Sequence, residues 1–106
     1  MQKNVAVEIK EGGRQGLTTV LELTVNNHPG VMSHICGLFS RRAYNLDGIV
    51  CIPAGTGEVS RMWLQVNEDE KLDQVIKQVR KLADVRQVLH HDGGHEVFAV
   101  LSVWQE

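Results

Sequence analysis

The segment from Asn26 to Met32, called the corner below, holds residue types from which a small-anion site can be built. Pro29 suits the first position of a helix, because its missing N–H would have no partner there. Gly30 leaves the free backbone N–H groups of the first helical turn uncovered. These donors and the positive end of the helix dipole converge on one point. The corner therefore predicts a carboxylate-binding site.

A plainer interpretation is that Asn, Pro and Gly only turn the chain from a strand into a helix. A carboxylate gains about 0.3–1 kcal/mol from the helix dipole, or ~2 kcal/mol when it is partly buried. This gain is too small to select one ligand, so specificity must come from other residues around the corner.

The elements that position the corner follow from the spacing of apolar residues. Alternation predicts strands over about 20–26, 46–52, 58–66 and 85–90, with Pro53 ending the second. A stripe containing Val31 and Ile35 predicts a helix over about 30–42. Asn67 and Glu70 resemble a capping box, which predicts that a second helix begins there, with its apolar stripe over 72–82.

The order of these elements is β-α-β-β-α-β. It predicts an α+β, ferredoxin-like fold, in which a four-stranded antiparallel sheet carries both helices on one face. The other face is left uncovered, with Val20, Thr24 and Trp63 pointing outward. Gly37 in mid-helix costs about 0.5–1 kcal/mol relative to Ala, which close approach of a second helix would justify. These features predict a homodimer.

We expect three segments along the chain. Residues 1–17 form a flexible N-terminal lead-in, residues 18–92 the compact domain, and residues 93–106 an apolar C-terminal extension. The β-branched content of Val97–Trp104 favours a strand, and its apolar character suggests docking onto a partner or a neighbouring protomer.

Composition narrows the function classes. The 106 residues carry a net charge of −2 and no basic run longer than Arg41–Arg42, which argues against nucleic acid. No apolar run approaches the ~20 residues that span a bilayer, and no signal-peptide core is present. We therefore expect a cytoplasmic protein without membrane contact, with Cys36 and Cys51 as reduced core residues.

The residues argue against three other functions: a metal site, an acylphosphatase-like enzyme and an RNA-binding domain. His91 and His95 are four residues apart, but Gly93 and Gly94 oppose a helix between them, which favours a solvated loop and no metal site. An acylphosphatase-like enzyme needs an Arg in the loop after its first strand, and residues 26–30 contain none. An RNA-binding domain of this topology needs exposed aromatic residues on its central strands, where Trp63 stands alone.

Three runs, Leu21–Met32, Gly37–Arg42 and Tyr44–Ile49, resemble the ACT domain of the small regulatory subunits of acetolactate synthase (acetohydroxyacid synthase). The resemblance spans about residues 18–91. It rests on the motif Asn-x-Pro-Gly-Val-Met followed, in order, by Gly-Leu-Phe-x-Arg-Arg-x-Tyr-Asn. With no second domain after it, the chain resembles the short type that accompanies isozyme I, although its lead-in through Gly16 is longer.

The resemblance implies a non-catalytic subunit that binds a branched-chain amino acid, chiefly L-valine, between two ACT protomers. It implies feedback inhibition and activation of a catalytic large subunit at the head of branched-chain amino acid biosynthesis. Thiamine diphosphate, Mg²⁺ and FAD would belong to that partner, with no cofactor in this chain. The alternative is an ACT module that senses an amino acid for a different enzyme.

The resemblance also implies site residues. Asn27 matches the turn asparagine, Pro29 and Gly30 the start of the helix, and Val31 and Met32 the positions whose N–H groups would hold the carboxylate. Asn45 matches an asparagine expected to reach the ligand from the neighbouring protomer. Met32, Ile35 and Ile49 are expected to wall the apolar pocket for the ligand side chain.

Overall fold

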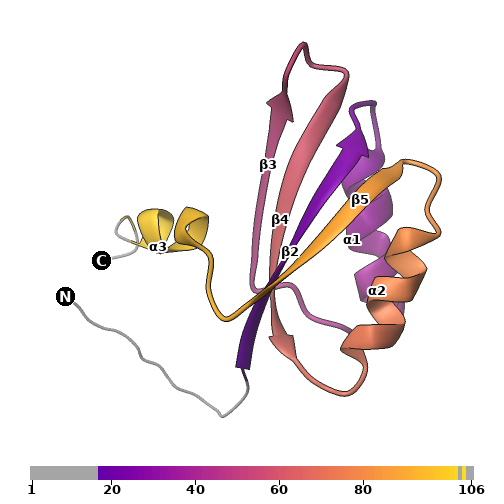
Figure 1. The fold of residues 1–106 in the computed structure, drawn as a ribbon. Helices are drawn as coiled ribbons and strands as arrows, with labels where there is room; N and C mark the ends of the chain where they lie inside the picture. The colour runs from indigo at the N-terminus through magenta and orange to yellow at the C-terminus, as the bar shows by residue number, and fades with distance from the viewer. Residues whose placement is uncertain (1–16, 103, 105–106) are drawn as a thin grey trace.

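The computed structural model describes residues 17–102 and 104. A four-stranded antiparallel sheet runs in the order β3 (Gly48–Ala54), β4 (Val59–Glu68), β2 (Leu17–Asn26), β5 (Val85–Asp92). Helices α1 (Val31–Arg41) and α2 (Leu72–Arg80) cover one face (Figure 1). The predicted α+β, ferredoxin-like βαββαβ fold is confirmed.

The core lies between the sheet and these two helices. Apolar residues of the central strands β2 and β4 alternate toward it, and the stripes of α1 and α2 pack against them. Each fully buried aliphatic or aromatic side chain contributes roughly 1.5–3 kcal/mol. The buried members include Leu21, Leu23, Val25, Ile35, Phe39, Met62, Leu64, Val75 and Val79. The lead-in predicted for residues 1–17 lies outside the described residues, except for Leu17, which begins β2.

Two strand boundaries differ from the prediction. β5 continues past His90, because His91 and Asp92 pair with Val20 and Thr19 of β2. β3 runs through Pro53, which was predicted to end it. β3 is an edge strand, and a proline is tolerated at a sheet edge because its missing N–H breaks no ladder that the sheet needs.

The predicted start of α2 at an Asn67 cap is wrong. Asn67 lies within β4 and pairs with Thr18, so sheet pairing prevails over the local capping signal. The helix begins at Leu72, and the turn before it is held by Asp69, whose Oδ1 accepts the N–H of Lys71 at 2.7 Å.

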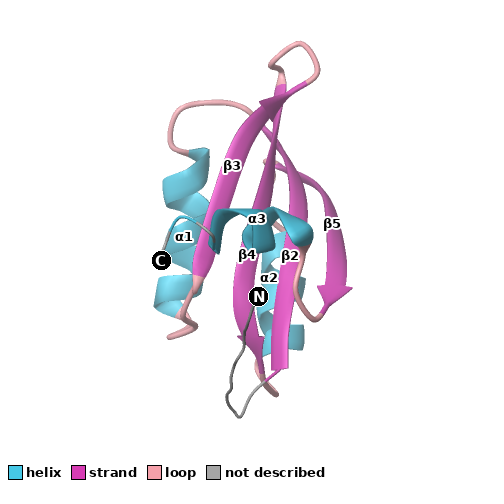
Figure 2. Ribbon diagram, turned by 90° about the vertical axis from the view of Figure 1, so that its left-hand side faces the viewer, coloured by secondary structure: helices cyan, strands magenta, loops and turns pink. Residues whose placement is uncertain are grey.

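The C-terminal apolar segment is a helix, α3 (Glu96–Ser102), and the predicted strand is wrong. Its Phe98 packs so closely against Gly48 that a Cβ there would lie 2.7 Å from the ring. β-propensity is a weak guide where packing against an existing surface decides the conformation. Figures 1 and 2 show α3 on the side of the sheet away from α1 and α2.

The sheet face opposite α1 and α2 is only partly open. Val20, predicted to point outward into solvent, is fully buried, because the segment after β5 folds back over this end of the face. Thr24 and Trp63 are partly exposed on the same face. Within the described residues, no helix is long and apolar enough to cross a membrane.

Candidate functional site

The corner is a tight turn that leads directly into α1. The N–H of Val31 donates to the carbonyl of His28 at 3.3 Å, so Pro29 and Gly30 are the two central residues of a β-turn. Gly30 has φ 87° and ψ −7°, the values of a type II turn, which needs glycine at this position and favours proline before it. Pro29 therefore lies in the turn before the helix, and its predicted place at the first helical position is wrong.

The turn leaves backbone donors exposed at the start of α1. Met32 and Ser33, the second and third residues of the helix, find no acceptor for their N–H groups among the described residues. A Cβ built on Gly30 would meet no atom within 4 Å. The first turn of α1 also contains no acidic side chain. An external anion can therefore approach these donors from solvent.

His28 lies in the same turn and joins the corner to Asp84, a contact that no pattern in the sequence indicated. Its Nδ1 lies 2.7 Å from the carbonyl oxygen of Pro29, and its Nε2 lies 2.6 Å from Oδ2 of Asp84. The hydrogen bond to Pro29 and the one to Asp84 raise the pKa of His28 above its usual value. Both acceptors suit the imidazolium, which donates from both nitrogens. No local pattern marks this contact, because Asp84 lies in the turn before β5.

Asp84 is matched to this role. Hydrogen bonds from His28 and from Asn26 lower the pKa of its carboxyl group, so it stays ionised. The N–H of Asn26 also donates to the carbonyl of Asp84 at 2.8 Å. The corner is therefore fixed to the turn between α2 and β5.

Asn27 fixes the corner on its other side. Its backbone N–H donates to the carbonyl of Glu58 at 3.0 Å, and its Nδ2 donates to the carbonyl of Gly57 at 2.9 Å. These bonds hold the corner to the β3–β4 hairpin. The Oδ1 of Asn27 has no donor among the described residues and is placed to accept a hydrogen bond from a ligand ammonium group.

Two of the remaining predicted site residues, Asn45 and Ile49, lie at the other end of the sheet. Asn26, at the corner, pairs with Val59, whereas Gly48 pairs with Gln65, six residues farther along β4. At ~3.3 Å per residue the two ends are about 20 Å apart. Ile49 follows Gly48 directly, and Asn45 precedes it by three residues. Neither can share a small ligand with the corner of its own protomer.

The structure places the three predicted wall residues in three different environments. Met32 is 41% exposed beside the corner, and Ile49 is 41% exposed on the edge strand β3. Ile35 is 1% exposed and belongs to the core, so it lines no surface of the protomer. Of the three, only Met32 belongs to the corner.

Asn45 is held in place by the way α1 ends. Ala43 adopts φ 55°, the N–H of Tyr44 donates to the carbonyl of Phe39 at 2.9 Å, and that of Ala43 donates to Ser40 at 3.0 Å. This is a Schellman ending with alanine in the position that usually holds glycine. The Tyr44 hydroxyl then donates to the carbonyl of Asn67, and burial raises the pKa of Tyr44 to about 12. Asn45 is exposed and its Nδ2 donates to Asp47.

A groove of about 650 Å³ lies elsewhere, between the start of β3 and α3. Its lining includes Gly48, Ile49, Gln65 and Phe98 and no residue of the corner. Concavity and the converging donors thus mark different parts of the protomer. We take the corner as the candidate site because a carboxylate requires hydrogen-bond donors, which the corner offers. An exposed surface of this kind becomes an enclosed pocket if a second chain covers it.

Comparison with known proteins gives the family to which this chain belongs. Residues 21–87 match the family described as the AHAS small subunit-like ACT domain. The chain is 48% identical over 85 residues to the acetolactate synthase isozyme 1 small subunit of Escherichia coli K12, covering 80% of this chain and 88% of that one. It is 40% identical over 70 residues to the isozyme 3 small subunit of the same organism, covering 65% of this chain and 43% of that one.

A solved structure shows the same relationship. The acetolactate synthase small subunit of Thermotoga maritima superposes with a TM-score of 0.63 at 34% identity, over 69% of this chain and 46% of that one. The matched region contains the corner, α1 and Asn45. The chain belongs to the family of acetolactate synthase small subunits and carries the ACT domain of that family.

Proposed function

We propose that this protein is a regulatory subunit that binds L-valine, or another branched-chain amino acid, at the interface of an ACT homodimer. Binding transmits feedback inhibition to a catalytic large subunit of acetolactate synthase, which the protein also activates. The large subunit holds the thiamine diphosphate, Mg²⁺ and FAD of the reaction, and this chain is non-catalytic. The complex works in the cytoplasm, in branched-chain amino acid biosynthesis.

The chemistry of the corner supports an amino acid as the ligand. A zwitterion needs N–H donors for its carboxylate and an acceptor for its ammonium group. The N–H groups of Met32 and Ser33 supply the donors, and Oδ1 of Asn27 supplies an acceptor. When His28 is protonated it adds a positive charge near the carboxylate, which the ionised Asp84, 2.6 Å from its ring, largely offsets.

The separation of the site residues carries the proposal of a dimer. The corner offers polar groups and Met32, while Asn45 and Ile49 lie about 20 Å away at the opposite end of β3 and β4. In a two-fold dimer, one end of each protomer can meet the other end of its partner, which brings both sets together twice. The corner of one protomer and the Asn45 region of the other then form one enclosed site.

The edge of the protomer beside α1 has the features of such an interface. In Figure 2, α1 lies behind the sheet toward the edge formed by β3, whose Ile49 and Ile52 are 41% and 48% exposed. Within the protomer, a Cβ at Gly37 would meet only the flexible end of Arg41, at 3.3 Å. Packing inside one chain therefore does not require glycine there, whereas close approach of a second α1 does.

Calorimetric titration of the purified chain with L-valine tests the ligand, with D-valine and L-lysine as controls. We expect saturable heat from L-valine only, because an enclosed site with fixed donors distinguishes stereoisomers. A folded dimer that gives no heat with any branched-chain amino acid would overturn the proposal. Selective binding of an unrelated amino acid would instead favour an ACT sensor for a different enzyme.

Mixing two inactive variants tests the shared site. Gly30→Asp removes the corner of its own protomer, and Asn45→Ala removes the group that reaches the partner's corner. A mixed dimer of the two retains one intact site, made from the unmodified corner of one chain and the unmodified Asn45 of the other. We expect L-valine binding to return on mixing. If each site lay within one protomer, mixing would restore nothing.

A further inference from the structure

Two histidines and a glutamate from three segments meet on the sheet face that α3 overlies. Glu22 lies on β2, His91 near the end of β5 and His95 in the loop before α3. Each offers a ligand atom within 4.8 Å of the other two. We propose that Glu22, His91 and His95 bind a divalent transition-metal ion such as Zn²⁺. The loop predicted from Gly93 and Gly94 is confirmed, since both glycines are exposed and lie outside any helix, and this loop brings the two histidines together.

The three side chains are already held close to one another. Oε1 of Glu22 lies 2.9 Å from Nε2 of His91, and the rings of His91 and His95 have their centroids 4.9 Å apart. The side chains of Glu22 and His91 are 16% and 34% exposed. Arg61 Nε lies 3.6 Å from the other carboxylate oxygen, Oε2 of Glu22, and restrains that group from its outer side. An ion can enter from solvent and find its ligands assembled.

The donor set suits Zn²⁺. Imidazole nitrogens and carboxylate oxygens bind this ion at ~2.0–2.2 Å, and two histidines with one carboxylate leave a fourth position for water. Ligand atoms around a tetrahedral ion at these bond lengths are about 3.3 Å apart. The Glu22–His91 contact therefore needs to open by only a few tenths of an ångström. A neutral His91 transfers its Nε2 proton to Nδ1, and an imidazolium releases a proton to solvent.

Coordination by His95 changes one contact of α3. Its Nδ1 now accepts the N–H of Val97 at 3.1 Å. A metal ion on Nδ1 replaces that N–H, and a metal ion on Nε2 leaves the proton on Nδ1, so Val97 loses its acceptor in either case. Val97 is in the first turn of α3, where an N–H lacks an intrahelical partner and solvent can satisfy it.

Trp63 supplies an independent sign that a polar group is missing here. Its Nε1 is buried and has no acceptor among the described residues. The indole ring lies against His95, with the centroids 6.1 Å apart. A water molecule in the fourth coordination position, on the Trp63 side, supplies that acceptor. Buried N–H groups without partners are uncommon in folded proteins.

A bound ion would fix α3 to the sheet, because His95 immediately precedes that helix.

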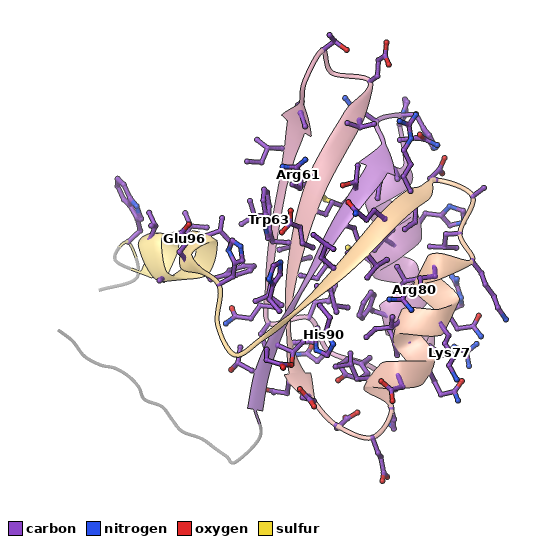
Figure 3. The ribbon with its side chains drawn as sticks, viewed as in Figure 1. Arg61, Trp63, Lys77, Arg80, His90 and Glu96 are labelled. Carbon is purple, nitrogen blue, oxygen red and sulfur yellow. The ribbon has the colours of Figure 1, made fainter. Side chains whose placement is uncertain are left out.

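The molecule also offers a matched control. Glu68, His90 and Asp92 form a second group of possible ligands, but all three are exposed. His90 lies on the face turned toward α2, whereas Trp63 lies on the face turned toward α3 (Figure 3). His90 and His91 are thus chain neighbours on opposite faces of the sheet.

The test is titration of the metal-stripped full chain with Zn²⁺ in competition with a chromogenic chelator. We expect one ion per chain. His95→Ala and Glu22→Gln should weaken binding by at least about 10–100-fold, the loss that even outer-shell changes cause at metal sites. His90→Ala should bind as the parent does. Co²⁺ provides a second readout, since a visible absorption band present in the parent and in His90→Ala should be absent from His95→Ala.

His95 lies in a loop outside the core, so His95→Ala remains informative even if Glu22→Gln fails to fold. Circular dichroism and gel filtration confirm that each variant used is folded. Absence of Zn²⁺ and Co²⁺ binding by the parent would overturn the proposal. Binding lost in His90→Ala but retained in His95→Ala would also overturn it, and would place the ion at the exposed group instead.

Discussion

The N-termini of α1 and α2 both carry the positive end of a helix dipole, but the side chains around them differ. At α2, the protein uses its own carboxylates: Asp69 accepts the N–H of Lys71, and Asp73 lies in the first turn. At α1, the first turn has no acidic residue, and its donors at Met32 and Ser33 are exposed. Nearby His28 is paired with Asp84 and ties the corner to the turn before β5. One helix start is neutralised within the chain, and the other is left for an anion from outside.

The difference explains why a helix N-terminus alone does not identify a binding site. α2 also begins with N–H groups, those of Asp73 and Gln74, that have no acceptor among the described residues, but its turn at Lys71 is right-handed and its first helical turn carries the carboxylate of Asp73. α1 differs through a proline–glycine turn that carries no side-chain acceptor, and through neighbours that remove its remaining flexibility. The side-chain Nδ2 groups of Asn26 and Asn27 donate hydrogen bonds to Asp84 and Gly57 in the surrounding turns.

The largest expected effect comes from giving α1 the feature that α2 already has. Gly30→Asp places a carboxylate on the donors, and we expect L-valine affinity to fall about 100-fold or more. Two charge-assisted hydrogen bonds lost at ~1.5–3 kcal/mol each account for such a change. Isothermal titration calorimetry measures it.

Gly30→Asn is the matched control for this prediction. Asparagine has the same shape as aspartate without its charge. Among residues other than glycine, it is one of those that best tolerate a positive φ. A side chain at this position also meets no atom of the protomer within 4 Å. We expect Gly30→Asn to retain affinity within about tenfold of the parent. Equal losses in both variants would show that space at the interface, and not charge, controls the corner.

The converse experiment removes the internal carboxylate of α2. Asp69→Ala leaves the N–H of Lys71 without its acceptor, and we expect the free energy of unfolding to fall by about 1 kcal/mol, as for the loss of a helix cap. L-valine affinity should not change. Urea denaturation followed by circular dichroism gives the stability, and Asp69→Asn, which keeps an acceptor oxygen, should lose less. A loss of L-valine affinity in folded Asp69→Ala would contradict the division between the two helices.

α1 also differs from α2 in how it ends, with Ala43 at φ 55°. A residue with a Cβ is strained in this region by roughly 1–2 kcal/mol. Glycine removes this strain, but its unfolded chain has greater conformational freedom, which offsets part of the gain in stability. We expect Ala43→Gly to raise the free energy of unfolding by about 0.5–1 kcal/mol. Thermal denaturation measures the change, and Ala43→Val should shift stability in the opposite direction.

The sequence predicted the layers of the fold because alternating and helical apolar patterns are local. The apolar stripes predicted for the two helices, with Val31 and Ile35 in the first and Leu72 to Val79 in the second, belong to the core. The errors arose where distant pairing decided the outcome. Asn67 resembles a cap but pairs with Thr18. Val97–Trp104 was predicted to be a strand, but its residues as far as Ser102 belong to α3, where Phe98 packs on Gly48.

The candidate site was predictable to the same extent. The corner and its glycine follow from a short motif, since type II turns place proline and glycine side by side. The contact between His28 and Asp84 joins residues that are far apart in the chain, and no pattern around either residue indicates it. The meeting of Glu22, His91 and His95 likewise depends on the register of β2 and β5 and on the loop that returns over the sheet.

The smallest expected effect concerns this His28–Asp84 pair, which gives the corner of α1 a pH dependence. The pKa of His28 is raised, so its contribution to stability is complete below its ordinary pKa of 6.5 and is lost as the pH rises through the raised value. The pKa of Asp84 is lowered, so its contribution is present above its ordinary pKa of 3.8 and is lost as the pH falls through the lowered value. The pair is therefore strongest between these ordinary values.

L-valine binding should follow the same charge. Between pH 6 and pH 8.5 we expect the affinity to fall by less than about fivefold, since His28 is exposed and Asp84 only partly buried, so that solvent screens the pair. His28→Gln keeps a hydrogen-bonding side chain without the titration and should show a flat profile over this range. Calorimetry in buffers of matched ionic strength compares the two chains. A parent affinity independent of pH would mean that the backbone donors alone hold the carboxylate, and that His28 only ties the corner to the turn before β5.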